Sequence, residues 1–95
     1  MHIESVECSD IVEEKLERKH GVTLREVRQV FLNQPRIRFA EEGYTAGEDV
    51  YVALGRTFGG RYMTVFFIFK PVSKVALVLS ARNMSDKERK SYGRK

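Results

Sequence analysis

The period of the hydrophobic pattern changes at Pro35, and this change restricts the chain to folds that join helices to a sheet. Before Pro35, Val27, Val30 and Phe31 recur at the three-to-four-residue spacing of a helix. From Ile37 onward, apolar residues alternate with polar ones, which is the period of a strand. Proline disfavours the helical conformation of the residue before it, so the helix ends where the alternation begins. The pattern therefore predicts the α+β class.

The N-terminal third predicts a short edge strand followed by two helices. Residues 2–8 have the composition of the strand, and residues 9–20 have helical spacing. Gly21 then supplies the left-handed residue that commonly ends a helix. A second helix begins at once, because Thr23 and Glu26 have the spacing of a capping box.

Four strands and a last helix follow Pro35. Gly59-Gly60 predicts a two-residue hairpin of type I′, in which both glycines adopt positive φ angles. Residues 62–69 are apolar on nearly both faces and are expected at the centre of the sheet. Ser85 and Glu88 resemble a second capping box, which opens a helix that ends near Tyr92. The four predicted strands begin at residues 36, 50, 62 and 75.

The length of 95 residues fits one domain, residues 1–95, with the element order β-α-α-β-β-β-β-α. We expect an antiparallel sheet packed on the two N-terminal helices, with a short C-terminal helix. The longest apolar runs have five residues, whereas a membrane-spanning helix needs about 20. Cys8 is the sole cysteine, so the chain has no internal disulfide, and a reducing cytoplasm is expected. One cysteine and two histidines are a poor ligand set, so we expect no metal or other cofactor.

The positive charge is concentrated at the C-terminus. Residues 1–81 contain 11 basic and 11 acidic residues, whereas residues 82–95 contain 6 basic and 2 acidic residues. The last stretch therefore accounts for the whole formal charge of +4. Its final pair, Arg94-Lys95, is expected to contribute only nonspecific attraction to a polyanion.

Three groups of residues resemble a known family. They are Lys19-His20-Gly21-Val22 with Glu26, the hairpin from Gly55-Arg56-Thr57 to Gly60-Arg61-Tyr62, and Ser80-Ala81-Arg82 followed by Glu88-Arg89 and Tyr92. In this order they look like the BrnT family, toxins of type II toxin–antitoxin pairs with a RelE-like ribonuclease fold. The resemblance runs from about residue 10 to Tyr92. The chain departs from the family at its N-terminus, since it has no tryptophan and lacks the F-x-W-D-like strand with which the family often begins.

The resemblance implies a bacterial or archaeal protein that cleaves RNA. It also implies a cognate antitoxin, typically a DNA-binding protein of the ribbon-helix-helix type that blocks the toxin. Metal-free RNA cleavage requires activation of the 2′-hydroxyl, stabilisation of charge on the phosphoryl oxygens and protonation of the 5′-oxygen.

Arginines are the first candidates for binding phosphate. Arg82 ends an apolar strand, and its guanidinium matches phosphate oxygens. The alternative for Arg82 is a salt bridge or packing over the start of the last helix. Arg56 and Arg61 flank the predicted turn, where two close cations are costly unless they share an anion. The alternative for this pair is a solubilising role.

The last helix and His20 supply the remaining candidates. Arg89 and Tyr92 are three residues apart and so share a helix face. Arg89 could bind a second phosphate, and Tyr92 could stack on a base, donate a proton or simply dock on the sheet. Glu88 is expected to complete its capping box rather than to act as a base. His20 has the side chain best suited to proton transfer at neutral pH, but it could equally stabilise the end of its helix.

We therefore expect a metal-independent endoribonuclease toxin held inactive by an antitoxin. Arg82 and Arg56 would bind the scissile phosphate, and His20 or Tyr92 would move protons. The residues expected to follow the RNA backbone are Arg61, Arg89 and Lys90. Two alternatives remain open, namely a non-catalytic nucleic-acid-binding module and an interaction domain that oligomerises through the strand at residues 62–69.

Overall fold

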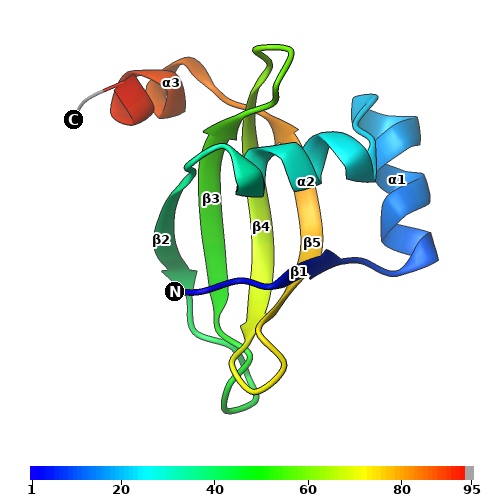
Figure 1. The fold of residues 1–95 in the computed structure, drawn as a ribbon, viewed down its shortest axis with the longest axis vertical. Helices are drawn as coiled ribbons and strands as arrows, with labels where there is room; N and C mark the ends of the chain where they lie inside the picture. Colours follow the sequence, from blue (N-terminus) through cyan, green and yellow to red (C-terminus); the bar gives the residue numbers. More distant parts are fainter. Residues whose placement is uncertain (94–95) are drawn as a thin grey trace.

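The computed structural model describes residues 1–93, which form one five-stranded sheet in the order β1-β5-β4-β3-β2 (Figure 1). The basic pair Arg94-Lys95 lies outside the described residues. The strands are β1 (Ser5–Glu7), β2 (Arg36–Glu41), β3 (Val50–Arg56), β4 (Tyr62–Lys70) and β5 (Val75–Asn83). The predicted element order is confirmed, and β4 lies in the centre of the sheet as expected.

The sheet is mixed rather than antiparallel throughout. Strands β2 to β5 form an antiparallel meander, but β1 pairs parallel with β5, with Ser5 opposite Val75. Parallel pairing requires a long crossover, and here both N-terminal helices and three strands lie between the paired segments.

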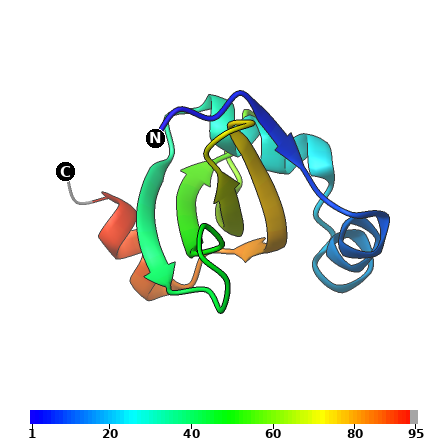
Figure 2. The same cartoon turned by 90° about the horizontal axis from the view of Figure 1, so that it is seen from below.

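The helices cover the two faces of the sheet unequally. Helix α2 (Leu24–Leu32) crosses one face and α1 (Asp10–His20) lies beside β5, whereas α3 (Asp86–Gly93) lies on the opposite side (Figures 1 and 2). We call the face under α2 the inner face and the face under α3 the outer face. Within residues 1–93, no helix is both long enough and apolar enough to cross a membrane.

Local capping explains where the helices begin and end. Ser9 caps α1, and Gly21 ends it with a φ of +60°. The Thr23–Glu26 capping box of α2 is present in both directions, as predicted.

The core lies between α2 and the inner face. Its fully buried residues include Val27 and Val30 of α2 and Met63, Val65 and Phe67 of β4. Burial of each such side chain contributes about 1.5–3 kcal/mol.

Residues 57–61 join β3 to β4, and a hydrogen bond between Thr57 and Arg61 closes a three-residue loop, Phe58–Gly60, so the predicted two-residue type I′ turn is wrong. The Thr57 amide donates to the carbonyl of Arg61 at 2.9 Å, and the Gly60 amide donates to the carbonyl of Thr57 at 3.0 Å. Of the two glycines at positions 59 and 60, only Gly60 has a positive φ, at +92°. The Thr57 hydroxyl accepts the Arg61 amide at 3.0 Å, which favours the longer loop. The loop changes the register by one residue, and Arg56 consequently faces Tyr62.

Candidate active site

The outer face of the sheet carries arginines from three strands. Directly opposed residues share a face, so Leu54, Thr64 and Arg82 lie on the same side of β3, β4 and β5. The Thr64 hydroxyl donates to Glu88 of α3 at 3.0 Å, which identifies this side as the outer face. Alternation along each strand then assigns the following arginines to it: Arg36 and Arg38 of β2, Arg56 of β3 and Arg82 of β5.

A cleft of about 650 Å³ lies where α3 meets these strands and the end of α2. It contains three arginines, two tyrosines and two side-chain amides, and no carboxylate of residues 1–93 lines it. The lining residues are Asn33, Gln34, Arg36, Arg56, Tyr62, Arg89, Tyr92 and Gly93.

The ring of Tyr62 contacts three of the side chains that line this cleft, namely Arg56, Arg89 and Tyr92. The guanidinium carbon of Arg56 lies 5.0 Å from the centre of the Tyr62 ring, and that of Arg89 lies 4.0 Å from it. Tyr92 meets the same ring edge to face, with 6.0 Å between ring centres. Arg56 reaches the ring from the neighbouring strand, whereas Arg89 and Tyr92 reach it from α3. The contacts thus join the hairpin to the helix.

Arg36 and Arg38 hold the C-terminal part of α3 against β2. Arg36 donates from Nη1 to the Ser91 carbonyl at 2.9 Å, and Arg38 donates from Nη2 to the Ser91 hydroxyl at 2.7 Å. A cation at the C-terminal end of a helix is favourable, because the last carbonyls carry partial negative charge.

The cleft arginines have no counter-charge within the part of the chain that the structure describes. Among residues 1–93, Arg36, Arg56 and Arg89 form no ion pair, although five other arginines and lysines do. Guanidinium groups gathered without an acid attract an anion, and their planar forks match phosphate oxygens.

Arg82 has a different environment, because Glu88 neutralises it. Its Nη1 and Nη2 donate to the two carboxylate oxygens of Glu88 at 2.7 and 2.9 Å. The same carboxylate accepts the Ser85 amide at 2.8 Å, and the Ser85 hydroxyl accepts the Glu88 amide at 3.1 Å. The predicted capping box is therefore confirmed, and the alternative that gave Arg82 a salt bridge agrees with the structure.

These bonds fix the protonation state of Glu88. The hydrogen bonds from Arg82, together with those from Ser85 and Thr64, outweigh partial burial and lower the pKa of Glu88 to about 2. The bond to Glu88 in turn raises the pKa of Arg82. A carboxylate with so low a pKa is a weak base, so Glu88 is poorly suited to general-base catalysis at neutral pH.

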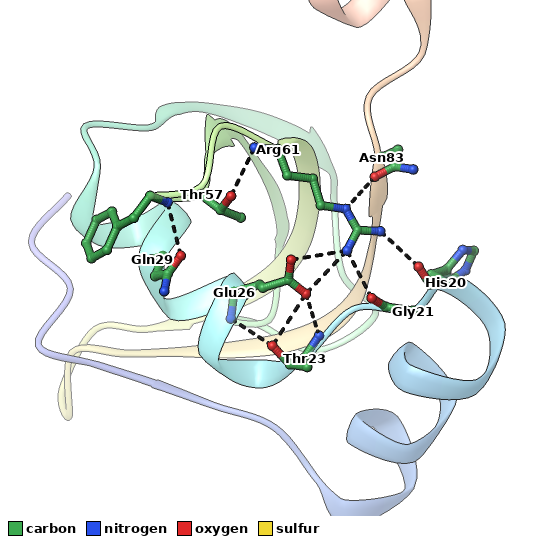
Figure 3. A network of polar contacts seen from close by, with 9 residues as sticks. His20, Gly21, Thr23, Glu26, Gln29, Thr57, Arg61 and Asn83 are labelled. Atoms are coloured by element: carbon green, nitrogen blue, oxygen red, sulfur yellow. Dashed lines mark hydrogen bonds and ion pairs between the residues drawn. The ribbon is translucent and has the colours of Figure 1, made fainter.

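Arg61 lies on the other side of the hairpin and is fully engaged there (Figure 3). It donates to the carbonyls of His20 and Gly21, both at 2.9 Å, to the Asn83 side chain at 2.7 Å and to Glu26 at 3.2 Å. Partial burial opposes ionisation of Glu26, but the bonds from Thr23 and Arg61 prevail and lower its pKa. Arg61 thus joins the α1–α2 junction to the sheet.

The family of the chain follows from a comparison with family models. Residues 12–88 match the model described as the ribonuclease toxin BrnT of type II toxin–antitoxin systems. The chain belongs to the BrnT family. It is accordingly a ribonuclease toxin of a type II system, and such a toxin has an antitoxin as its partner.

A solved structure shows the same fold. The crystal structure of the Brucella abortus ribonuclease toxin BrnT aligns with 86% of this chain and 97% of its own, with a TM-score of 0.56 and 20% identity. No curated protein matches the sequence. The family match includes Arg56 but ends at residue 88, so Arg89 and Tyr92 lie just beyond it.

The structure brings together three of the seven predicted site residues of this BrnT-family chain, namely Arg56, Arg89 and Tyr92. The other four, Arg82, His20, Arg61 and Lys90, do not line the cleft. For Arg82 and Arg61 the reason is a network of internal partners. His20 ends α1, across the sheet from α3 (Figure 1), and Lys90 is exposed beside the cleft residue Arg89.

Sequence reasoning missed Arg36 and Tyr62. In the sequence, Arg36 is one of the polar residues of an alternating strand, a pattern that is typical of a solvent-exposed position. Its place directly after Pro35 puts it at the end of β2 that lies nearest the tip of the β3–β4 hairpin. Tyr62 was hidden by the wrong turn type, since a two-residue loop would have placed Met63 opposite Arg56. The alternation Arg36-Ile37-Arg38 was the available signal for a basic face.

Proposed function

We propose that this BrnT-family toxin is a metal-independent endoribonuclease whose active site is the cleft around Tyr62. The observation that supports the proposal is the gathering of Arg36, Arg56 and Arg89 in a cleft that no carboxylate among the described residues lines. The scissile phosphate would lie between Arg56 and Arg89, whose guanidinium groups contact the same ring. Within the described residues Arg36 donates to the carbonyls of Ser91 and Tyr92 from Nη1 only, so its Nη2 and Nε groups would contact a neighbouring phosphate.

The chemistry uses the nucleophile that RNA carries. The 2′-oxygen gives its proton to water and bonds to phosphorus, the bond from phosphorus to the 5′-oxygen breaks, and the 5′-oxygen gains a proton. Negative charge builds up on the phosphoryl oxygens in the transition state, and preorganised cations there can supply the largest part of the rate enhancement. Tyr92 is our proposed proton donor to the 5′-oxygen, since its hydroxyl-bearing ring lines the same cleft.

Arg82 and Arg61 are left out of this active site. Their guanidinium groups already satisfy carboxylates and carbonyls, and releasing them to RNA would leave those acceptors unpaired. Lys90 and His20 would at most add attraction to the RNA backbone from outside the cleft.

The partner and setting complete the proposal. We propose that the antitoxin is a DNA-binding protein of the ribbon-helix-helix type and that the toxin acts on cytoplasmic RNA. Coexpression with the product of the neighbouring gene, followed by copurification and a cleavage assay, tests the first point. Failure of that product to bind or inhibit the toxin would contradict it.

Cleavage of RNA by the purified chain in excess EDTA tests the active site. We expect Arg56→Ala and Arg89→Ala each to lower kcat about 10²–10³-fold, as does removal of one preorganised donor elsewhere. Arg25→Ala is the matched control, because Arg25 is exposed on α2, away from the cleft, and its loss changes the net charge equally. Tyr92→Phe tests the proton donor in the same assay.

The competing functions give different results. A non-catalytic module would bind RNA in a salt-dependent way but leave its length unchanged. Cleavage by both cleft variants at the rate of Arg25→Ala would refute the proposed site, and loss of activity in EDTA would refute metal independence.

A further inference from the structure

We infer that Tyr62 is a positioning residue of the ribonuclease site, and that its aromatic ring holds the guanidinium groups of Arg56 and Arg89 where the scissile phosphate binds. This inference rests on the proposed function of the cleft. Tyr62 would contact neither the phosphate nor the reacting atoms. It would act through Arg56 and Arg89, which contact the phosphate.

The first argument is that the two arginines need something to hold them. Their guanidinium carbons lie 5.0 and 4.0 Å from one ring centre, so they cannot be more than 9 Å apart. Like charges at that separation repel, and within residues 1–93 no carboxylate forms an ion pair with Arg56 or Arg89. The electron-rich face of a tyrosine ring attracts each guanidinium and offsets the repulsion before an anion arrives.

The second argument is that Arg56 and Arg89 lack the anchors of the other cleft cation. Arg36 is held by the carbonyls of Ser91 and Tyr92 at 2.9 and 3.5 Å. Within the described residues, the side chains of Arg56 and Arg89 donate no hydrogen bond, and both residues are exposed. Their contact with the ring is thus the interaction that defines their orientation.

The third argument is that the fold holds the Tyr62 ring in place, so the ring can position the two arginines. It is half-buried on the central strand β4, directly opposite Arg56 in the ladder. Its carbonyl accepts the Met84 amide at 3.2 Å, and Tyr92 packs against its ring edge to face. Within residues 1–93 its hydroxyl makes no hydrogen bond with a side chain or the backbone, so the ring, not the phenol oxygen, is the working part.

The test compares Tyr62→Phe with Tyr62→Leu in the RNA cleavage assay, with kcat and KM measured separately. Phenylalanine keeps the ring, and we expect kcat within about threefold of the native value. Leucine removes the ring, and we expect kcat to fall about 10–100-fold with a smaller change in KM, because misplaced groups mainly harm the transition state. A double-mutant cycle with Arg89→Ala should be non-additive, since Tyr62 acts through that arginine.

Fluorinated phenylalanines incorporated at position 62 keep the test valid if the leucine variant fails to fold. Successive fluorine atoms weaken the attraction of the ring for cations and change its shape little. We expect kcat to fall with each added fluorine, while urea denaturation midpoints stay nearly constant.

Three results would overturn the inference: native kcat for Tyr62→Leu, equal losses for Tyr62→Phe and Tyr62→Leu, or insensitivity to fluorination. Activity of the arginine variants separates this failure from failure of the site itself. If Arg56→Ala and Arg89→Ala cleave normally, the proposed function is wrong. If they are impaired but the ring variants are not, only the positioning role is wrong.

Discussion

The pairing of Arg82 with Glu88 predicts that part of the stability of the protein depends on one carboxylate. The perturbation is Glu88→Gln, which removes the charge but keeps a side chain that can still accept the Ser85 amide in the capping box. The variant therefore separates the loss of the ion pair from the loss of the helix cap.

The magnitude follows from the lowered pKa. The pKa of Glu88 falls from its ordinary 4.5 to about 2, and each pKa unit corresponds to 1.36 kcal/mol, which gives about 3 kcal/mol. The side chain of Arg82 is 38% exposed, so water screens the ion pair. We therefore expect the pair to stabilise the folded state by about 1.5–2 kcal/mol. Because the folded pKa lies below the unfolded one, this stability is complete above about pH 4.5 and disappears as the pH falls toward 2.

Urea denaturation at several pH values between 7 and 2.5 measures the effect. At pH 7 we expect the free energy of unfolding of Glu88→Gln to be about 1.5–2 kcal/mol below that of the native chain, with the difference mostly gone at pH 2.5. Glu14→Gln is the matched control, because its pair with Arg18 is exposed on both sides and contributes about 0.3–0.5 kcal/mol. Parallel stability curves for the native chain and Glu88→Gln from pH 7 to 2.5 would refute the reasoning.

Three further variants test other contacts by urea denaturation. Arg61→Ala should lower the free energy of unfolding by about 2–3 kcal/mol, since it leaves a carboxylate and two carbonyls without their charged donor. A loss under about 1 kcal/mol would contradict the structural role of Arg61. Gly60→Ala should lower the free energy of unfolding by about 1–2 kcal/mol, because Gly60 has a φ of +92°. It should also lower RNA cleavage, since the new methyl group would lie 3.5 Å from Arg56 Nη2. Cleavage at the native rate would show that this contact does not matter. Gly55→Ala should lower the free energy of unfolding by about 1–3 kcal/mol, because its Cβ would lie 2.9 Å from a methyl group of α2. Gly93→Ala is the control, because a Cβ at that position meets nothing within 4 Å. Equal stability of the two variants would contradict the close packing at Gly55.

Elements whose determinants are local could be predicted from the sequence. The capping boxes at Thr23 and Ser85 each depend on residues three positions apart, and both are present. The central position of β4 also followed from its own composition, because a strand that is apolar on both faces must be covered on both.

Pairings between distant residues could not be predicted in the same way. One extra loop residue between β3 and β4 decides whether Arg56 faces Tyr62 or Met63, and the Gly59-Gly60 pair is compatible with either loop. The parallel pairing of β1 depends on a partner about 70 residues further along the chain, for which no local signal exists.

The roles of the arginines depended on their acidic partners, not on their own positions. Arg82 had the features of a phosphate ligand at a strand end, but Glu88 satisfies the helix cap and this arginine at once. Arg89 is the next residue after Glu88 but lines the cleft, where it contacts Tyr62 and forms no ion pair with any carboxylate of residues 1–93. The neutralised pair fixes the start of α3 to the outer face, and this attachment places Arg89 and Tyr92 over the cleft. The arginine that is unavailable to RNA therefore holds the helix from which the available one reaches the site.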